Sequence, residues 1–258
     1  MNRPTLAVLL TVAGLAAVAG SLWNRYAIQP MARSDKESLL VHERLLGDAR
    51  RGHIDLYFVG DSITSRWIRE ARGNWHRNFG GWAAANFGRG GDKIPHVLWR
   101  LRHGELDGVH PKVIVVLAGA NDLGDAPPNA LMRAVIRRRL ESILATCHEK
   151  APAATIILTA IFPRGDNPAA VHAINRLNED LARLADGKTI RFLNVNAQLA
   201  DANGVQFPGL FVDTLHLGLP GYQVWADGLK PALTELLGPP AAIDRAPPPT
   251  SDPSAKKK

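Results

Sequence analysis

Short apolar runs alternate with longer amphipathic stretches along most of the chain. The runs are apolar on both faces, which is typical of strands that helices cover from two sides, and they occupy residues 54–59, 83–87, 113–117, 155–161 and 190–195. The longer stretches repeat apolar positions about every 3.6 residues, as helices do, and they occupy residues 36–51, 129–150, 168–186 and 219–237. Because strands separated by helices pair in parallel, the pattern predicts a flavodoxin-like α/β fold, a three-layer α/β/α sandwich with a parallel sheet of about five strands.

Both ends of the chain depart from this pattern, which leaves one predicted domain at residues 33–238. Near the amino end, the small-x-small sequence Ala17-Val18-Ala19 follows an uncharged apolar run, and this predicts a signal peptide over residues 1–19. An uncleaved membrane anchor is the alternative, because the apolar stretch of residues 5–23 has about the length of a membrane span. Either alternative exports the domain, to the periplasm or the cell exterior, free or anchored in the inner membrane.

The remaining segments are predicted to lie outside the packed domain. Residues 20–32 are expected to be a linker, and residues 239–258 a disordered tail that is rich in proline and ends in three lysines.

Composition and charge exclude several classes of function. Hydrophobic residues make up 46% of the chain and charged residues 21%, as in an ordinary globular protein. The net charge is +7, but much of the excess lies at the two chain ends, and no basic stripe interleaved with aromatic residues predicts nucleic-acid binding. The single cysteine, Cys147, excludes an intramolecular disulfide and a cysteine-based zinc site. The histidines show no metal-ligand spacing, so we expect no metal and no cofactor.

Polar sequences follow the first three predicted strands directly. They are Gly60-Asp61-Ser62, Gly88-Arg89-Gly90-Gly91-Asp92 and Gly119-Ala120-Asn121-Asp122. Each alone is typical of an ordinary turn or of a helix cap. However, open parallel sheets bind ligands at the carboxyl ends of their strands, and all three sequences are expected at that edge.

Two histidines follow an aspartate at a spacing of three residues. Such a carboxylate can meet the imidazole in a turn and stabilise its protonated form. The pair Asp107 and His110 precedes the third predicted strand and therefore belongs to the opposite edge of the sheet. The pair Asp213 and His216 follows the last strand, so we prefer it as the candidate functional pair.

Taken together and in this order, the three polar sequences and the pair Asp213 and His216 resemble the four conserved sequence blocks of the SGNH (GDSL-type) hydrolases. The similarity is closest to the platelet-activating-factor acetylhydrolase-like group, through the segments Asn86–Asp92, His96–Leu101, Gly104–Leu106 and Pro163–Gly165. It implies the SGNH hydrolase fold. It also implies that Ser62 is a nucleophile, that His216 is its base, and that Asp213 orients the histidine. The implied oxyanion hole consists of the backbone N–H groups of Ser62 and Gly91 and the side-chain amide of Asn121.

The resemblance predicts a serine esterase that acts on a small-molecule or glycan ester, and the amino-terminal segment predicts that it is exported. The alternatives are a carbohydrate O-deacetylase of the same family and a non-catalytic ligand-binding domain of the cell envelope. Arg89 and Asp122 are expected to place charge at the mouth of the site. We expect only short connections between strand ends and helices, and therefore a preference for short acyl groups. The oligomeric state stays open.

Overall fold

The computed structural model describes residues 28–124, 128–167 and 170–247. Its centre is one parallel sheet in the order β2-β1-β3-β4-β5, with every neighbouring pair in parallel register. The strands are β1 (Leu56–Gly60), β2 (Ala84–Gly88), β3 (Val113–Leu117), β4 (Thr155–Thr159) and β5 (Ile190–Leu193). The predicted flavodoxin-like α/β/α sandwich with five strands is therefore confirmed, and the strand bounds differ from the predicted ones by at most two residues.

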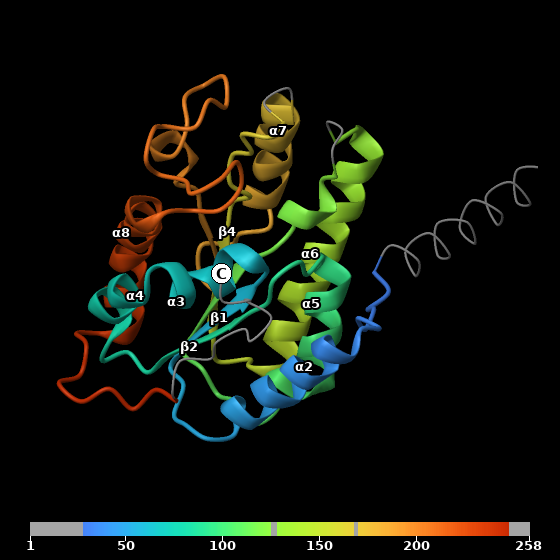
Figure 1. Cartoon of the computed structure of the whole chain (residues 1–258). Helices are drawn as coiled ribbons and strands as arrows, with labels where there is room; N and C mark the ends of the chain where they lie inside the picture. Colours follow the sequence, from blue (N-terminus) through green and yellow to red (C-terminus); the bar gives the residue numbers. More distant parts are fainter. Residues whose placement is uncertain (1–27, 125–127, 168–169, 248–258) are drawn as a thin grey trace, which may run out of the picture.

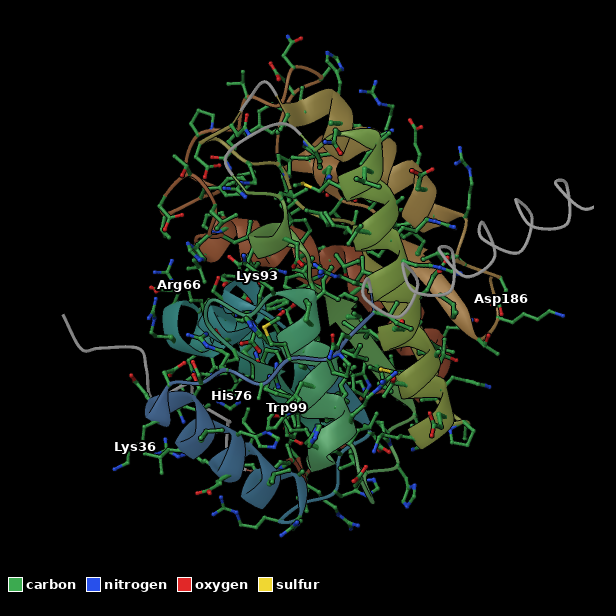
Figure 2. All side chains as sticks on the ribbon, turned by 90° about the vertical axis from the view of Figure 1, so that its right-hand side faces the viewer. Lys36, Arg66, His76, Lys93, Trp99 and Asp186 are labelled. Carbon is green, nitrogen blue, oxygen red and sulfur yellow. The ribbon has the colours of Figure 1, made fainter. Side chains whose placement is uncertain are left out.

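Helices cover both faces of the sheet (Figure 1). One layer consists of α2 (Lys36–Ala49), α5 (Ile94–Arg100), α6 (Ala130–Lys150) and α7 (Val171–Ala182), and the other of α3 (Ser62–Glu70), α4 (Arg72–Phe79) and α8 (Leu219–Leu237). Figure 2 looks onto the first layer, with Lys36 at the start of α2 and Trp99 on α5. Short helical turns lie at Leu101–Glu105 after α5, at Ala120–Asp122 after β3 and at Asn196–Gln198 after β5.

Two apolar cores lie on the two faces of the sheet, as the alternation of side chains along each strand requires. On β1, Tyr57 and Val59 belong to the core under the first helix layer, and Leu56 and Phe58 to the core under the second. Phe58 packs edge-to-face on Trp67 of α3, with 5.8 Å between the ring centroids. This packing fixes α3 on the sheet. Because α3 begins at Ser62, the packing also fixes the position of Ser62.

The edge strand β5 differs from the prediction that all five strands are apolar on both faces. All four of its residues are only half-buried. Arg191 in its middle forms a bidentate ion pair with Glu235 of α8, at 2.7 and 2.6 Å. The prediction was wrong here because an edge strand has one unpaired side, where a polar side chain can reach solvent.

The connection from β5 to α8 is long, at residues 194–218, so the expectation that all such connections are short was wrong. Two isolated antiparallel bridges, Ala200 with Gln206 and Phe211 with Leu217, fold this connection back on itself. The Gln206 side-chain amide donates to the carbonyl oxygens of Pro163 and Thr214. The bond to Pro163 holds the connection against the loop that follows β4, and the bond to Thr214 holds two parts of the connection together.

Part of the expected disordered tail packs on the domain. The N–H of Ala241 donates to the carbonyl of Gly81 at 2.9 Å, and Pro247 is buried against Gly52. Residues 239–245 are exposed and form no helix or strand, so the predicted tail contacts the domain at these two points; residues 248–258 lie outside the described residues.

The described chain begins at residue 28, so the predicted signal peptide or anchor lies outside it. The same holds for most of the predicted linker. Among the helices that the structure describes, none is long and apolar enough to cross a membrane.

Candidate active site

Ser62 lies where β1 passes into α3. It is the first residue of the helix, so its N–H belongs to the end of α3 where backbone donors have no partner within the helix. Asp61 caps the helix by accepting the N–H of Ile63 at 2.9 Å. The Asp61 side chain is fully buried, and this burial raises the pKa of its carboxyl to about 7. The sequence Gly60-Asp61-Ser62 is therefore a strand-to-helix turn that presents Ser62.

The structure brings Ser62, His216 and Asp213 together, as the sequence predicts. His216 Nε2 lies 2.8 Å from Ser62 Oγ, although the two residues are 154 positions apart in the chain. On the other side of the ring, Nδ1 lies 2.8 Å from Asp213 Oδ2. When Nδ1 donates its proton to Asp213, Nε2 is left as an acceptor for the serine hydroxyl. This is the geometry that a serine nucleophile and its base require.

The turn at residues 213–216 is held by the carboxylate itself. Asp213 Oδ1 accepts the N–H groups of Leu215 and His216 at 2.8 and 2.7 Å. Burial alone would raise the pKa of Asp213, but these two bonds and the His216 ring outweigh it and lower the pKa to about 2. Asp213 is therefore charged at neutral pH and can stabilise an imidazolium.

The pKa of His216 lies below its ordinary value of 6.5. Burial is the largest cause, and the positive charges of Arg66 and Arg69 on α3 lower the pKa further, against the opposing effect of Asp213. The ring is therefore neutral at neutral pH, which is the form that accepts a proton.

Arg66 is a site residue that sequence reasoning missed. Its Nη1 donates to Asp213 Oδ2 at 3.2 Å, from a position one helical turn after Ser62. Residues four apart lie on the same helix face. If the sequence after Ser62 had been recognised as a helix, the spacing of four residues would have placed Arg66 on the same face as Ser62, close to the Asp213 and His216 pair.

The implied oxyanion donors lie at neighbouring strand ends. Gly60, at the end of β1, is in register with Gly88 of β2 and Leu117 of β3, so Ser62, Gly91 and Asn121 follow at nearly the same level. Gly91 is exposed and has a φ of +74°, a conformation that favours glycine. The Asn121 amide donates to the carbonyl of Asp92 at 2.9 Å, which holds it beside Gly91.

Arg89 and Asp122 do not place charge at the mouth of the site, so both expectations were wrong. Arg89 is 3% exposed and donates to Ser38 Oγ at 2.6 Å. The Asp122 carboxylate is buried and accepts from the N–H of Ile94 and from Arg139. Both side chains turn inward because α2, α5 and α6 offer them polar partners there, which the sequence alone does not show.

The second aspartate–histidine pair has a different setting. His110 is exposed just before β3, at the amino edge of the sheet, and Asp107 pairs with Lys150. In the parts of the chain that the structure describes, no cluster of three or more histidine, cysteine or acidic side chains could hold a metal ion.

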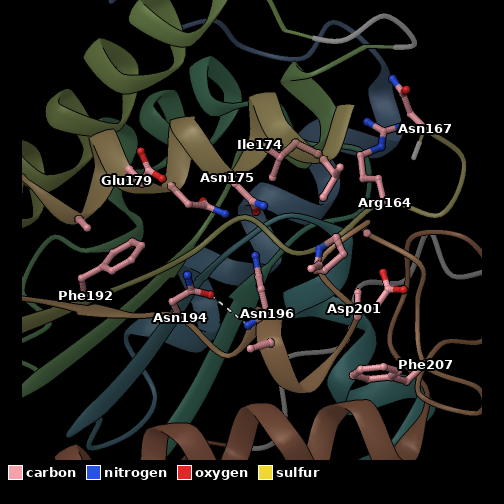
Figure 3. A pocket seen from close by; sticks show the side chains of 18 residues that line it. Arg164, Asn167, Ile174, Asn175, Glu179, Phe192, Asn194, Asn196, Asp201 and Phe207 are labelled. Carbon is pink, nitrogen blue, oxygen red and sulfur yellow. Dashed lines mark hydrogen bonds between the residues drawn. The ribbon is translucent and has the colours of Figure 1, made fainter. Parts of the chain in front are cut away.

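A cavity of about 560 Å³ lies at the ends of β4 and β5, between α7 and the connection that follows β5 (Figure 3). Asparagine side chains dominate its polar lining, from positions 167, 175, 178, 194 and 196. Arg164, at one end of the cavity, donates to the carbonyl of Ala120, next to Asn121. The cavity thus carries several side-chain amides, and Arg164 connects its lining to the segment that holds Asn121.

Comparisons with known proteins agree with this fold. The model of the GDSL-like lipase/acylhydrolase family matches residues 58–224. Platelet-activating factor acetylhydrolase IB subunit alpha1 from Bos taurus is 29% identical over 207 residues, which cover 80% of this chain and 86% of that protein. The alpha2 subunit from Gallus gallus is 30% identical over 208 residues, or 80% and 87% of the two chains. A solved structure of a platelet activating factor protein from Streptococcus pneumonia shares the fold, with a TM-score of 0.65 and 24% identity over 84% of this chain and 99% of that one.

Proposed function

Because the chain belongs to the GDSL-like lipase/acylhydrolase family, we propose that it hydrolyses carboxylic esters through an acyl-enzyme on Ser62. The observation that carries the proposal is the continuous contact from Ser62 Oγ to His216 Nε2, and from His216 Nδ1 to Asp213. A pure binding domain does not require this arrangement.

In the first step, His216 Nε2 takes the hydroxyl proton of Ser62 while Oγ attacks the carbonyl carbon of the ester. The carbonyl electrons move onto oxygen and form an oxyanion. When the oxyanion collapses, the ester C–O bond breaks, and His216 gives its proton to the departing alcohol. A water molecule then attacks the acyl-enzyme in the same way, with His216 again as base, and releases the acid.

The oxyanion is stabilised by donors that exist before the reaction begins. The proposed donors are the N–H groups of Ser62 and Gly91 and the amide of Asn121, and the aligned ends of β1, β2 and β3 support this assignment. Removing one such donor typically costs about 3 kcal/mol of transition-state stabilisation. The start of α3 contributes a favourable local field, since the N-terminal end of a helix dipole is positive.

We further propose that the acyl group is short and that the protein is exported. The relatives named acetylhydrolases support an acetyl group. Export is supported by the signal-like sequence of residues 1–19.

Carbohydrate O-deacetylation is the second candidate, and the cavity is the observation that favours it. A side-chain amide both donates and accepts hydrogen bonds, as a sugar hydroxyl does, so several asparagines match a hydroxyl-rich alcohol. Comparing kcat/KM for an acetylated oligosaccharide and for p-nitrophenyl acetate separates the two candidates. A sugar ester preferred over the simple ester selects deacetylation.

The central test is the variant Ser62→Ala, which removes a hydroxyl from a partly exposed turn and opens no core cavity. We expect hydrolysis of p-nitrophenyl acetate to fall by at least about 10³-fold, with an unchanged circular dichroism spectrum. His216→Ala should have a similar effect, while the matched control His110→Ala should keep most of the activity. A Ser62→Ala enzyme as active as the wild type would exclude the proposed nucleophile.

A further inference from the structure

Three arginines surround the fully buried carboxylate of Asp92, the residue that follows Gly91. Arg100 Nε donates to Asp92 Oδ2 at 2.7 Å. On the other oxygen, Arg33 and Arg89 lie 3.7 and 4.0 Å from Oδ1. The glycine loop, residues 88–92, therefore ends at an ion-pair centre that none of the catalytic steps described above uses.

Arg100 connects this centre to the rest of the candidate oxyanion hole. Its Nη2 donates to the carbonyl of Gly60 at 3.3 Å, two residues before Ser62. The backbone carbonyl of Asp92 in turn accepts the amide of Asn121 at 2.9 Å. Through these bonds one side chain holds the three segments that carry the implied donors Ser62, Gly91 and Asn121.

The remaining nitrogen of Arg100 faces the core. Nη1 pairs with Glu105, which is completely buried and also lies 2.9 Å from His42 Nδ1. Arg100 itself is 2% exposed. This network explains the segments around His96–Leu101 and Gly104–Leu106, which the sequence resemblance singled out and to which the catalytic steps assign no role.

Arg33 holds the same loop from outside. Its Nη1 donates to the carbonyl of Gly90 at 2.8 Å, and the N–H of Met31 donates to the carbonyl of Pro95 at 3.0 Å. The segment before α2 therefore lies across the glycine loop. A Cβ placed on Gly91 would come within 3.3 Å of Arg33 Nη1, so the two are in close contact.

We propose that Arg100 and Arg33 are positioning residues for the oxyanion hole, acting through Asp92 from the core side and the surface side of the glycine loop. The proposal rests on the proposed esterase function. A buried ion pair adds little net stability, because removing both charges from water costs about as much as their attraction returns. Oxyanion donors, in contrast, must be held within about 0.5 Å of their working positions, and a loop with several glycines does not hold itself.

Neither arginine reaches the reacting atoms in this arrangement, so each acts through the loop. The oxyanion exists only in the transition state and the intermediate. Loosening the donors should therefore lower kcat for a small ester while KM changes little. A purely structural role would instead lower the fraction of folded enzyme and leave kcat per folded molecule unchanged.

Arg33→Ala is the sharpest test, because Arg33 is partly exposed and its loss should not unfold the domain. We expect kcat for p-nitrophenyl acetate to fall about tenfold, with KM within about twofold and an unchanged melting temperature. Arg33→Lys should restore part of the loss, since an ammonium can still donate to Gly90. Arg44→Ala, an exposed arginine of α2, is the matched control and should be as active as the wild type.

Asp92→Asn tests the centre of the network with little change in side-chain shape, and Arg100→Lys keeps the buried charge. Both should lower kcat per folded molecule, as measured after the folded fraction is determined by circular dichroism. Unchanged kcat in both Arg33→Ala and Asp92→Asn would overturn the proposal.

Hydrogen exchange separates this proposal from the esterase function. In the inactive Ser62→Ala protein, Arg33→Ala should speed amide exchange in the peptide of residues 88–95, while Arg44→Ala should not. Faster exchange supports the positioning role even if the substrate class proves different, and unchanged exchange contradicts it whatever the enzyme hydrolyses.

Discussion

His216 is surrounded by charges from two separate elements. Asp213, from its own turn, contacts Nδ1, and Arg66 and Arg69 approach from α3. The arginines and burial favour the neutral ring, whereas Asp213 favours the charged one. Since the neutral ring is the base, kcat/KM should rise with pH as His216 loses its proton, with an apparent pKa below 6.5.

Arg66→Gln tests this balance. The variant removes a nearby positive charge and leaves Asp213 paired with His216 alone, and both effects raise the histidine pKa. We therefore expect the acid limb of the kcat/KM profile for p-nitrophenyl acetate, measured from pH 4 to 8, to move to higher pH. Arg69→Gln, which removes the weaker of the two arginine effects, should move it less. An acid limb that stays in place or moves to lower pH would show that Arg66 does not influence the base.

For single residues, the sequence revealed which side chains the site contains but not where each side chain points. Ser62, Asp213 and His216 could be found because the polar sequences, taken together and in order, resemble those of the SGNH hydrolases, whereas each alone is equally typical of a turn. Arg89 was misplaced because its charge is visible in the sequence but its partner Ser38, 51 positions away, is not. The contact of Arg66 with Asp213 spans 147 positions and was missed for the same reason.

Among the elements, strands were easier to predict than helices near the site. Central strands are buried on both faces, so their apolar runs are nearly continuous. The helices α3, α4 and α5 were missed because each begins in a polar sequence that is equally typical of a turn. In α5, Pro95 occupies the first helical turn, where proline is tolerated, and Gly104 with a φ of +106° lies in the irregular turn that follows.

The packed part of the carboxyl end should contribute to stability. A chain ending at Gly238 lacks the bond from Ala241 to Gly81 and the burial of Pro247, which a chain ending at Pro247 retains. One hydrogen bond contributes about 1 kcal/mol, and 1 kcal/mol corresponds to about 2–4 °C in a domain of this size. Thermal unfolding should therefore show a melting temperature lower by a few degrees in the shorter chain. Equal melting temperatures would mean that residues 239–247 contribute nothing to folding stability.

In the whole molecule, the site depends on the complete sheet. Ser62 follows β1, Asn121 follows β3, and His216 lies on the connection from β5 to α8. The bond from Gly165 N–H to the carbonyl of Thr214, at 2.8 Å, joins this connection to the loop after β4. The histidine turn is therefore held against the sheet edge from the side of β4, which gives the site a fixed wall there.

The connection from β5 to α8 also bears on the length of the acyl group that the enzyme should accept. Val205, Phe207 and Val212 on the connection are exposed to solvent. Each methylene that a protein buries adds about 0.8 kcal/mol to binding, but a chain that extends into water gains nothing. We therefore expect kcat/KM to be highest for p-nitrophenyl acetate or butyrate and to fall for octanoate and palmitate, all measured below their aggregation concentrations. A maximum at octanoate or palmitate would require an apolar channel and would replace the short-acyl proposal with a lipase or thioesterase.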